Sequence, residues 1–257
     1  FLNILKNKFK VFECADRYKG STNYLTVLKN KKIHYKIDNI PIINNYDQIL
    51  NFFKKKIIKI IKKLNGKEIN VLYLHQNDFH ILSNKKVLRA LSFLKNKKYF
   101  KYIGVSVYSE KELKFALNCN IYKFIQIPLN LVDSSMYFKN FKNFKKKKIV
   151  ARSIFLQGVI FNEQKNKNIN SKIKNYRKKI FKICKEYNIS IEELAINFVS
   201  SLKKIDYIIM GSISEKNIQN IKNIFLKKTL KREIMKKLIK LSSTKKKWAN
   251  PKNWVTK

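Results

Sequence analysis

Four polar side chains at the predicted ends of strands could together carry out proton transfer to a substrate oxygen. Glu13 and Tyr18 lie around the end of a first strand, Lys36 at the end of a second, and His75 directly after a third. A lysine that is paired with a carboxylate favours the phenolate of a nearby tyrosine, and so makes that phenol a better proton donor. A histidine nearby can hydrogen-bond the same substrate oxygen. Taken singly, each has a structural interpretation: a loop aromatic, a surface lysine, a strand-end carboxylate and a strand-end histidine.

The apolar run before His75 is the element that positions this chemistry. Val71 to Leu74 is typical of a strand buried on both faces of a parallel sheet. In parallel α/β folds, the loops after the strands converge on one crevice, and the strands hold the first residues of those loops rigidly. The ends of neighbouring strands would therefore bring the four side chains together.

Short β-branched or aromatic runs alternate with amphipathic runs along the whole chain. We expect strands at Lys10–Cys14, Lys32–Ile37, Val71–Leu74, Tyr102–Val107, Phe124–Ile127, Ile149–Ser153 and Tyr207–Met210. We expect helices at Tyr24–Lys29, Tyr46–Leu64, Lys85–Asn96, Glu110–Leu117, Lys172–Tyr187, Ile191–Leu202, from Glu215 and at Leu230–Leu241, with the end of a further helix at Phe1–Lys8. Loops are expected at Asn77–Asn84, Pro128–Tyr137 and Asn162–Asn170.

This alternation predicts an α/β fold, a (β/α)8 TIM barrel that lacks its first strand. The regular spacing, and the absence of a Gly-rich phosphate loop after the first strand, favour a barrel over an open sheet. A chain of 257 residues is long enough for one large domain or two small ones. No linker divides it, so we expect residues 1–257 to form a single domain, truncated at its N-terminus.

The formal charge of +42 raises the hypothesis of a polyanion-binding protein. Only five of the 58 basic residues are arginines, whereas nucleic-acid recognition usually favours arginine for bidentate contacts. An excess of lysine, asparagine and isoleucine is also what an AT-rich gene would encode on any fold. We therefore expect no specific nucleic-acid binding, only weak nonspecific binding at low salt.

Composition also indicates where in the cell the protein is found and which types of site it can contain. No apolar run approaches the roughly 20 residues of a membrane span. The three cysteines are widely separated without a CxxC pair, which argues against zinc and disulfides and favours a reducing cytoplasm. No spacing of metal ligands is present, so no metal site is predicted.

Seven segments in a fixed order resemble the aldo-keto reductase superfamily, from about residue 9 to residue 224. They are FECADRYKGS, KIHYKI, NVLYLHQND, KYIGVSVYS, FIQIPLN, VARSIFLQGVI and IIMGSISEKNIQNI. The phrases IGVSVYS, IQIPLNLVD and RSIFLQG, with the tail around Pro251 and Trp254, look most like the branch associated with bacterial surface-polysaccharide and sugar biosynthesis.

The resemblance implies a (β/α)8 barrel that uses NADP(H) to reduce an aldehyde or ketone, a small-molecule carbonyl substrate. By position, Tyr18 matches the general acid, Lys36 the residue that lowers the pKa of this acid, and His75 the partner that orients the carbonyl. Glu13 falls where the family has aspartate, five residues before the tyrosine.

The same resemblance implies a set of cofactor-binding residues. Ser106 and Gln126 match the positions that hold the nicotinamide carboxamide, and Arg152 replaces the aromatic residue that stacks on the nicotinamide ring. Ser153 and Phe155 match the turn that contacts the pyrophosphate. Gly211, Ser212 and Asn217 match the loop and helix start that receive the adenosine and its 2′-phosphate.

Several positions depart from the family pattern. Glu13 is one methylene longer than aspartate, so its pairing with Lys36 would require a shift of the lysine or the backbone. Asn220 and Ile221 replace the Glu-Asn pair that touches adenine. These departures leave an alternative open: a catalytically degraded relative that keeps the fold and nucleotide binding.

Overall fold

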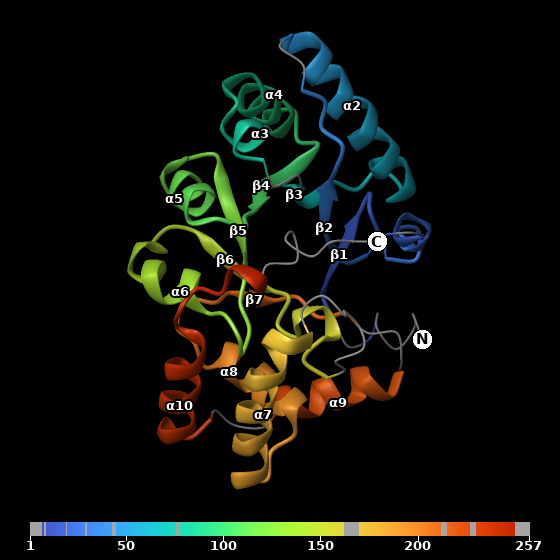
Figure 1. Ribbon diagram of the computed structural model, residues 1–257. Helices are drawn as coiled ribbons and strands as arrows, with labels where there is room; N and C mark the ends of the chain where they lie inside the picture. The colour runs from blue at the N-terminus through green and yellow to red at the C-terminus, as the bar shows by residue number, and fades with distance from the viewer. Residues whose placement is uncertain are drawn as a thin grey trace. The chain divides into compact units, whose positions relative to one another are not determined.

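The computed structural model describes residues 7, 9–18, 20–28, 30–42, 45–75, 78–161, 170–211, 215–226 and 230–249, drawn as coloured ribbon in Figure 1. The chain divides into two compact units, Phe1–Gln126 and Ile127–Lys257. The single-domain organisation stays a prediction.

The first unit is built on parallel strands that follow one another across the sheet in chain order. They are β1 Val11–Ala15, β2 Lys32–Ile37, β3 Ile69–Leu74, β4 Phe100–Ser106 and β5 Tyr122–Pro128, of which the last two residues belong to the second unit. The register pairs Ala15 with Lys36, Lys36 with Tyr73 and Ser106 with Gln126. The carboxyl ends of these strands therefore lie at one edge of the sheet, where the predicted catalytic residues are found.

Helical segments connect these strands, and the α-helices among them bury apolar side chains. They are η1 Ser21–Tyr24, α2 Tyr46–Lys63, α3 Phe79–Ser83, α4 Lys85–Asn96 and α5 Glu110–Asn118. In α2 the buried residues recur at helical spacing, and Lys62 and Lys63 occupy the last turn, where cations complement the helix dipole. The predicted cap of α5 is confirmed: Ser109 Oγ accepts from the Glu112 N–H, and the Glu112 carboxylate accepts from the Ser109 N–H.

The core of the first unit contains two tyrosines on neighbouring strands, Tyr35 on β2 and Tyr73 on β3, both at most 1% exposed. Gly104 on β4 makes room for Tyr73, because a Cβ atom at this position would overlap the Tyr73 ring. His34 is also buried, and its Nε2 lies 3.2 Å from Asn70 Oδ1. His34 is thus a core residue, in line with its predicted lack of a role.

The second unit contains two parallel strands, β6 Lys148–Arg152 and β7 Tyr207–Ile208, which pair Val150 with Tyr207. Its helical segments are α6 Ser135–Asn140, η2 Phe141–Asn143, η3 Leu156–Gly158, α7 Asn170–Glu186, α8 Ile191–Ser200, α9 Glu215–Leu226, α10 Arg232–Ser242 and η6 Lys247–Ala249. Ser190 caps α8 by accepting from the Glu193 N–H, as its position before an apolar run predicts.

Three local predictions are wrong. Tyr24–Lys29 does not form a helix: a 3-10 turn at Ser21–Tyr24 is followed by further turns. The expected loops at Asn77–Asn84 and Pro128–Tyr137 instead contain α3 and the start of α6, because both short helices bury apolar side chains, among them Leu82 and Tyr137, that periodicity cannot reveal over so few residues.

Some predictions fall on residues outside the described ranges. These are the helix at Phe1–Lys8, of which only Asn7 and its helical backbone are described, the loop over residues 162–169, and the tail with Pro251 and Trp254. Within the described ranges, no helix has both the length and the apolar character needed to cross a membrane.

Candidate active site

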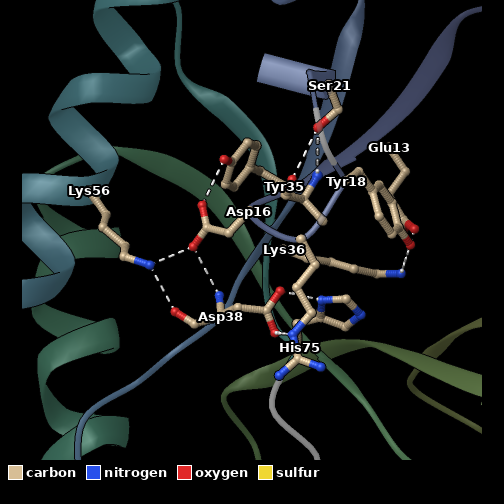
Figure 2. Close-up of polar contacts among 11 residues, drawn as sticks. Glu13, Asp16, Tyr18, Ser21, Tyr35, Lys36, Asp38, Lys56 and His75 are labelled. Atoms are coloured by element: carbon tan, nitrogen blue, oxygen red, sulfur yellow. Dashed lines mark hydrogen bonds and ion pairs between the residues drawn. The ribbon is translucent and has the colours of Figure 1, made fainter. Parts of the chain in front are cut away.

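A buried lysine lies between a carboxylate and a phenol in the first unit. Lys36, only 2% exposed, has its Nζ atom 2.5 Å from Glu13 Oε1 and donates a hydrogen bond of 3.2 Å to the Tyr18 hydroxyl. Figure 2 shows the Lys36 side chain extending toward the Tyr18 hydroxyl. Because a cation beside a phenol oxygen stabilises the phenolate, this arrangement can support proton donation by Tyr18.

Register and a tight turn place these three groups. Ala15 lies opposite Lys36 in the pairing of β1 with β2, so Glu13 and Lys36 are close along neighbouring strands. Tyr18 then follows in a turn in which its N–H donates to the Ala15 carbonyl at 3.1 Å, and Ser21 Oγ donates to the same carbonyl at 3.0 Å. The turn leaves the Tyr18 ring 43% exposed, as a group that must reach a substrate requires.

The longer side chain of Glu13 contacts two partners instead of one. Its Oε1 pairs with Lys36, and its Oε2 accepts a hydrogen bond from the amide nitrogen of Gln126. The Glu13 carboxylate therefore bridges Lys36 and Gln126. Ser106 is paired with Gln126 in the sheet and is fully buried.

His75 lies beside Tyr18, at the end of β3. Its ring and the Tyr18 ring form an edge contact, with centroids 6.0 Å apart and planes at 77°. The His75 N–H donates to the Ile37 carbonyl at 3.1 Å, which continues the sheet pairing and fixes the backbone. The structure therefore brings together Glu13, Tyr18, Lys36 and His75, as the sequence predicts.

An acidic residue that the sequence reasoning missed holds His75. Asp38 Oδ2 lies 2.6 Å from His75 Nδ1, and the Asp38 side chain is only 1% exposed (Figure 2). Its other oxygen, Oδ1, forms an ion pair with Arg17 Nε at 3.1 Å. A signal was present in the sequence: Asp38 follows Lys36 by two residues at the same strand end.

A second missed carboxylate, Asp16, supports this segment from the other side. Asp16 accepts hydrogen bonds from the Tyr35 hydroxyl at 2.8 Å and from the Asp38 N–H at 3.0 Å. Lys56 on α2 reaches both Asp16 Oδ2, at 2.5 Å, and the Asp38 carbonyl, at 2.8 Å. The loop after β2 is therefore held by contacts from Asp16, directly after β1, and from α2.

Burial shifts the pKa values of groups around this site. Burial, with a smaller effect of Glu13, raises the pKa of Cys14 to about 11, so its thiol stays protonated at neutral pH. Burial likewise raises the pKa of Tyr35, helped by Asp16. Burial lowers the pKa of His34 to about 4, so this histidine is neutral at physiological pH.

The remaining predicted cofactor residues lie in the second unit. Arg152 ends β6, is 6% exposed, and lies with its Nη1 3.4 Å from Ser153 Oγ. Ser153 has a left-handed backbone, with φ 57°, and Leu156 and Gln157 after Phe155 are also left-handed. Phe155 packs on Phe161 with ring centroids 5.2 Å apart.

The predicted adenosine-binding residues follow β7. Gly211 is exposed and has open space where a Cβ atom would lie, and Asn217 is exposed on α9. Ser212 lies outside the described residues. Within the described part of the chain, no group of three or more histidine, cysteine, aspartate or glutamate side chains is arranged to hold a metal ion.

Comparisons with known proteins agree with this geometry. The sequence model of the Aldo/keto reductase family matches residues 4–242. The chain belongs to the aldo-keto reductase family. It is thus an oxidoreductase of this superfamily, whose members use a nicotinamide cofactor on small carbonyl substrates. A comparison with the sequences of curated proteins found no match.

Solved structures of aldo-keto reductases share the fold at low sequence identity. The apo form of aldo-keto reductase AKR11C1 from Bacillus halodurans is 14% identical, with a TM-score of 0.74 over 96% of this chain and 87% of that one. The aldo-keto reductase MGS-M4 from a Medee basin deep-sea metagenome is 18% identical, with a TM-score of 0.71 over 95% and 85%. The thermostable aldo-keto reductase Tm1743, in complex with the inhibitor epalrestat, is 17% identical, with a TM-score of 0.70 over 93% and 85%. The (β/α)8 fold is confirmed, with seven of its strands among the described residues.

One buried atom of this aldo-keto reductase fits a nicotinamide cofactor. Gln126 is fully buried, and its Oε1 has no hydrogen-bond partner among the described residues, although its amide nitrogen is bound to Glu13. A buried amide oxygen without a donor costs about 1–3 kcal/mol. The carboxamide of a nicotinamide carries two N–H donors, so it is a group that could satisfy this acceptor.

Proposed function

We propose that this protein is an NADP(H)-dependent reductase that converts an aldehyde or ketone to an alcohol, with Tyr18 as the general acid. The observation that carries the proposal is the contact of Lys36 Nζ with both the Glu13 carboxylate and the Tyr18 hydroxyl. A buried ammonium group that is held by a carboxylate is fixed in place, and from there it favours the phenolate. His75 lies at the edge of the same phenol ring.

The proposed reaction needs three contributions from the chain. When bound, the dihydronicotinamide supplies a hydride to the carbonyl carbon. Tyr18 gives its hydroxyl proton to the carbonyl oxygen, so that the C=O bond becomes an alcohol with one new C–H and one new O–H bond. Lys36 stabilises the phenolate that this transfer leaves, and the phenolate recovers a proton from solvent. His75 orients the carbonyl oxygen beside Tyr18.

We infer roles in cofactor binding for the residues that match the family's cofactor positions. Ser106 and Gln126 would hold the nicotinamide carboxamide, and Arg152 would stack on its ring through the flat guanidinium group. Ser153 and Phe155 would contact the pyrophosphate. Gly211, Ser212 and Asn217 would receive the adenosine and its 2′-phosphate, which is the basis for NADP(H) over NAD(H).

The geometry favours an active enzyme over a catalytically degraded relative. The altered carboxylate at Glu13 is one reason for the degraded alternative, and Glu13 forms a close ion pair with Lys36. The likeness of IGVSVYS, IQIPLNLVD and RSIFLQG to the sugar-biosynthesis branch makes sugar-derived carbonyl compounds the substrate class to test first. The reverse reaction, oxidation of an alcohol, is tested with NADP⁺ and the alcohols that correspond to these carbonyl compounds.

The decisive experiment compares two tyrosine variants that are matched in exposure. NADPH binding is followed by tryptophan fluorescence, and NADPH oxidation is followed in the presence of a generic aldehyde and a series of sugar aldehydes. Tyr18→Phe should lower kcat by at least about 100-fold, the usual contribution of a general acid, while NADPH affinity is kept. Tyr24→Phe is the control, since Tyr24 is 47% exposed and Tyr18 43%. Equal turnover in the two variants would remove Tyr18 as the acid.

A further inference from the structure

The carboxylate of Asp38 determines which ring nitrogen of His75 carries a hydrogen. Asp38 Oδ2 lies 2.6 Å from His75 Nδ1, a hydrogen-bond distance. An ionised carboxylate only accepts hydrogen bonds, so Nδ1 must be the donor. When the imidazole is neutral, its Nε2 then carries a lone pair and accepts.

The side chain of Asp38 is not free to release this contact. Arg17 Nε pairs with Oδ1 at 3.1 Å, while the backbone of Asp38 is bound by Asp16 at its N–H and by Lys56 at its carbonyl. The Asp38 side chain is 1% exposed, so water offers little competition for its oxygens. Both the carboxylate and the peptide groups on either side of it are therefore fixed.

Figure 2 shows the consequence for the other ring nitrogen. The imidazole of His75 meets Asp38 with one nitrogen and turns the second away from it, toward the side on which the Lys36 ammonium and the Tyr18 hydroxyl lie. The edge contact between the His75 and Tyr18 rings agrees with this view. Nε2 is thus the ring nitrogen that does not face Asp38.

We propose that Asp38 is a positioning residue for the reduction proposed above, acting through His75. It excludes the neutral imidazole that donates from Nε2. A neutral His75 accepts a hydrogen bond from a hydroxyl, which matches an alcohol, whereas only the imidazolium donates to a carbonyl oxygen. Asp38 accordingly fixes the ring so that Nε2, and not Nδ1, faces the substrate oxygen, while the proton that is transferred comes from Tyr18. The positioning role of Asp38 rests on the proposed function, whereas the tautomer of His75 does not depend on it.

The test of the tautomer uses nitrogen NMR of the imidazoles in the wild-type protein. The chain has three histidines, so His75→Gln assigns the His75 signals by their loss. In the neutral ring, Nδ1 of His75 should show the shift and two-bond couplings of an N–H nitrogen. His34 is an internal reference, because its Nε2 faces Asn70 Oδ1 and should be the N–H in that ring. A signal pattern for His75 like that of His34 would overturn the proposal.

Asp38→Asn then reverses the tautomer. Arg17 can only donate, so the new amide oxygen stays with Arg17 and the amide N–H group faces Nδ1 of His75, which must become the acceptor. The matched control is Asp16→Asn, because Asp16 contacts the same backbone but not His75. His75 should keep its hydrogen on Nδ1 in Asp16→Asn and lose it in Asp38→Asn. An unchanged tautomer in Asp38→Asn contradicts the proposal.

Kinetics separate this proposal from the function on which it rests. Asp38→Asn should lower kcat for reduction by about 10- to 100-fold, as the loss of a residue that orients a functional histidine does, while NADPH affinity is unchanged. A loss of stability alone would lower the active fraction, not kcat per folded molecule. A reversed tautomer with unchanged kcat overturns the positioning role. If the wild-type tautomer is as expected but no carbonyl is turned over, the proposed function fails and the hydrogen-bonded pair remains.

Discussion

Lys36 Nζ lies 2.5 Å from Glu13 Oε1, and both side chains are at most 9% exposed. Breaking one half of a buried ion pair leaves an uncompensated charge, which is far more costly than losing a pair at the surface. The same separation of 2.5 Å occurs between Lys237 and Glu186, whose side chains are 37% and 43% exposed. The two ion pairs have the same separation and differ in burial, so a comparison between them isolates the effect of burial.

The first prediction compares glutamine substitutions in these two pairs. Glu13→Gln should lower the free energy of unfolding by about 3 kcal/mol, because Lys36 stays buried without its counter-charge. Glu186→Gln should leave it nearly unchanged, because solvent screens the exposed pair. Chemical denaturation measures both. Equal losses in the two variants would show that the burial of the Glu13 pair does not matter.

The kcat values of two variants separate the effect of the charge of Glu13 from the effect of its side-chain length. Glu13→Asp keeps the charge but shortens the side chain by about 1.5 Å, so the carboxylate cannot bridge Lys36 and Gln126. Glu13→Gln keeps the length but not the charge. We expect the larger loss of kcat in Glu13→Gln, because Lys36 supports Tyr18 only while its own position is held by a carboxylate. A larger loss in Glu13→Asp would instead make the contact with Gln126 the important one.

The second prediction concerns the buried amide of Gln126. Gln126→Met keeps the volume but removes the acceptor that the nicotinamide carboxamide would use, so NADPH should bind about tenfold more weakly, the cost of one unsatisfied hydrogen bond. Gln48→Met is the control, because Gln48 is exposed at the start of α2. Fluorescence titration with NADPH measures both affinities, and an unchanged dissociation constant in Gln126→Met would exclude the contact.

The third prediction is a loss of stability in acid that depends on His34. Burial lowers the pKa of His34 in the folded state to about 4, from about 6.5 when unfolded, so the unfolded state binds the proton more tightly. The resulting contribution to the free energy of unfolding is complete above about pH 6.5 and is lost as the pH falls toward 4. Its upper limit is about 3 kcal/mol.

Two glutamine variants isolate this contribution. His34→Gln should flatten the decline in the free energy of unfolding between about pH 6.5 and 4, whereas His80→Gln should not, since His80 is exposed. Denaturation at a series of pH values gives the slopes. The general effect of the large positive charge is common to both variants and cancels in the comparison. If the free energy of unfolding declines with the same slope in both variants, His34 binds its proton as readily in the folded state as in the unfolded state.

The fourth prediction tests the close approach of β3 and β4. Gly104→Ala places a methyl group against the rigid Tyr73 ring, so we expect a loss of about 1–3 kcal/mol of unfolding free energy. Gly211→Ala should be nearly neutral for stability, because no atom lies within 4 Å of the added carbon. Tyr73→Leu combined with Gly104→Ala should recover part of the loss. If the double variant recovers none of the lost unfolding free energy, the strain in Gly104→Ala does not come from the Tyr73 ring.

The sequence alone determined the order and type of the main elements and the four residues of the proposed catalytic group. This information is local: Val71 to Leu74 form a buried strand because they are continuously apolar, and Ser109 caps a helix because Glu112 follows at the required spacing. The family motifs added the positions of Tyr18, Lys36 and His75. The short helices α3 and α6 escaped prediction because a helix of five or six residues has too few turns to show a period.

Only the tertiary structure decided which side chains meet. Glu13 and Gln126 are 113 residues apart in the chain, and their hydrogen bond depends on strand register and on the length of the glutamate. Asp38 and His75 come from different strand ends, and their contact depends on a loop held by Asp16 and Lys56. Periodicity records whether a residue is buried, but the direction of a side chain and the partner at its tip are set by the folded backbone around it.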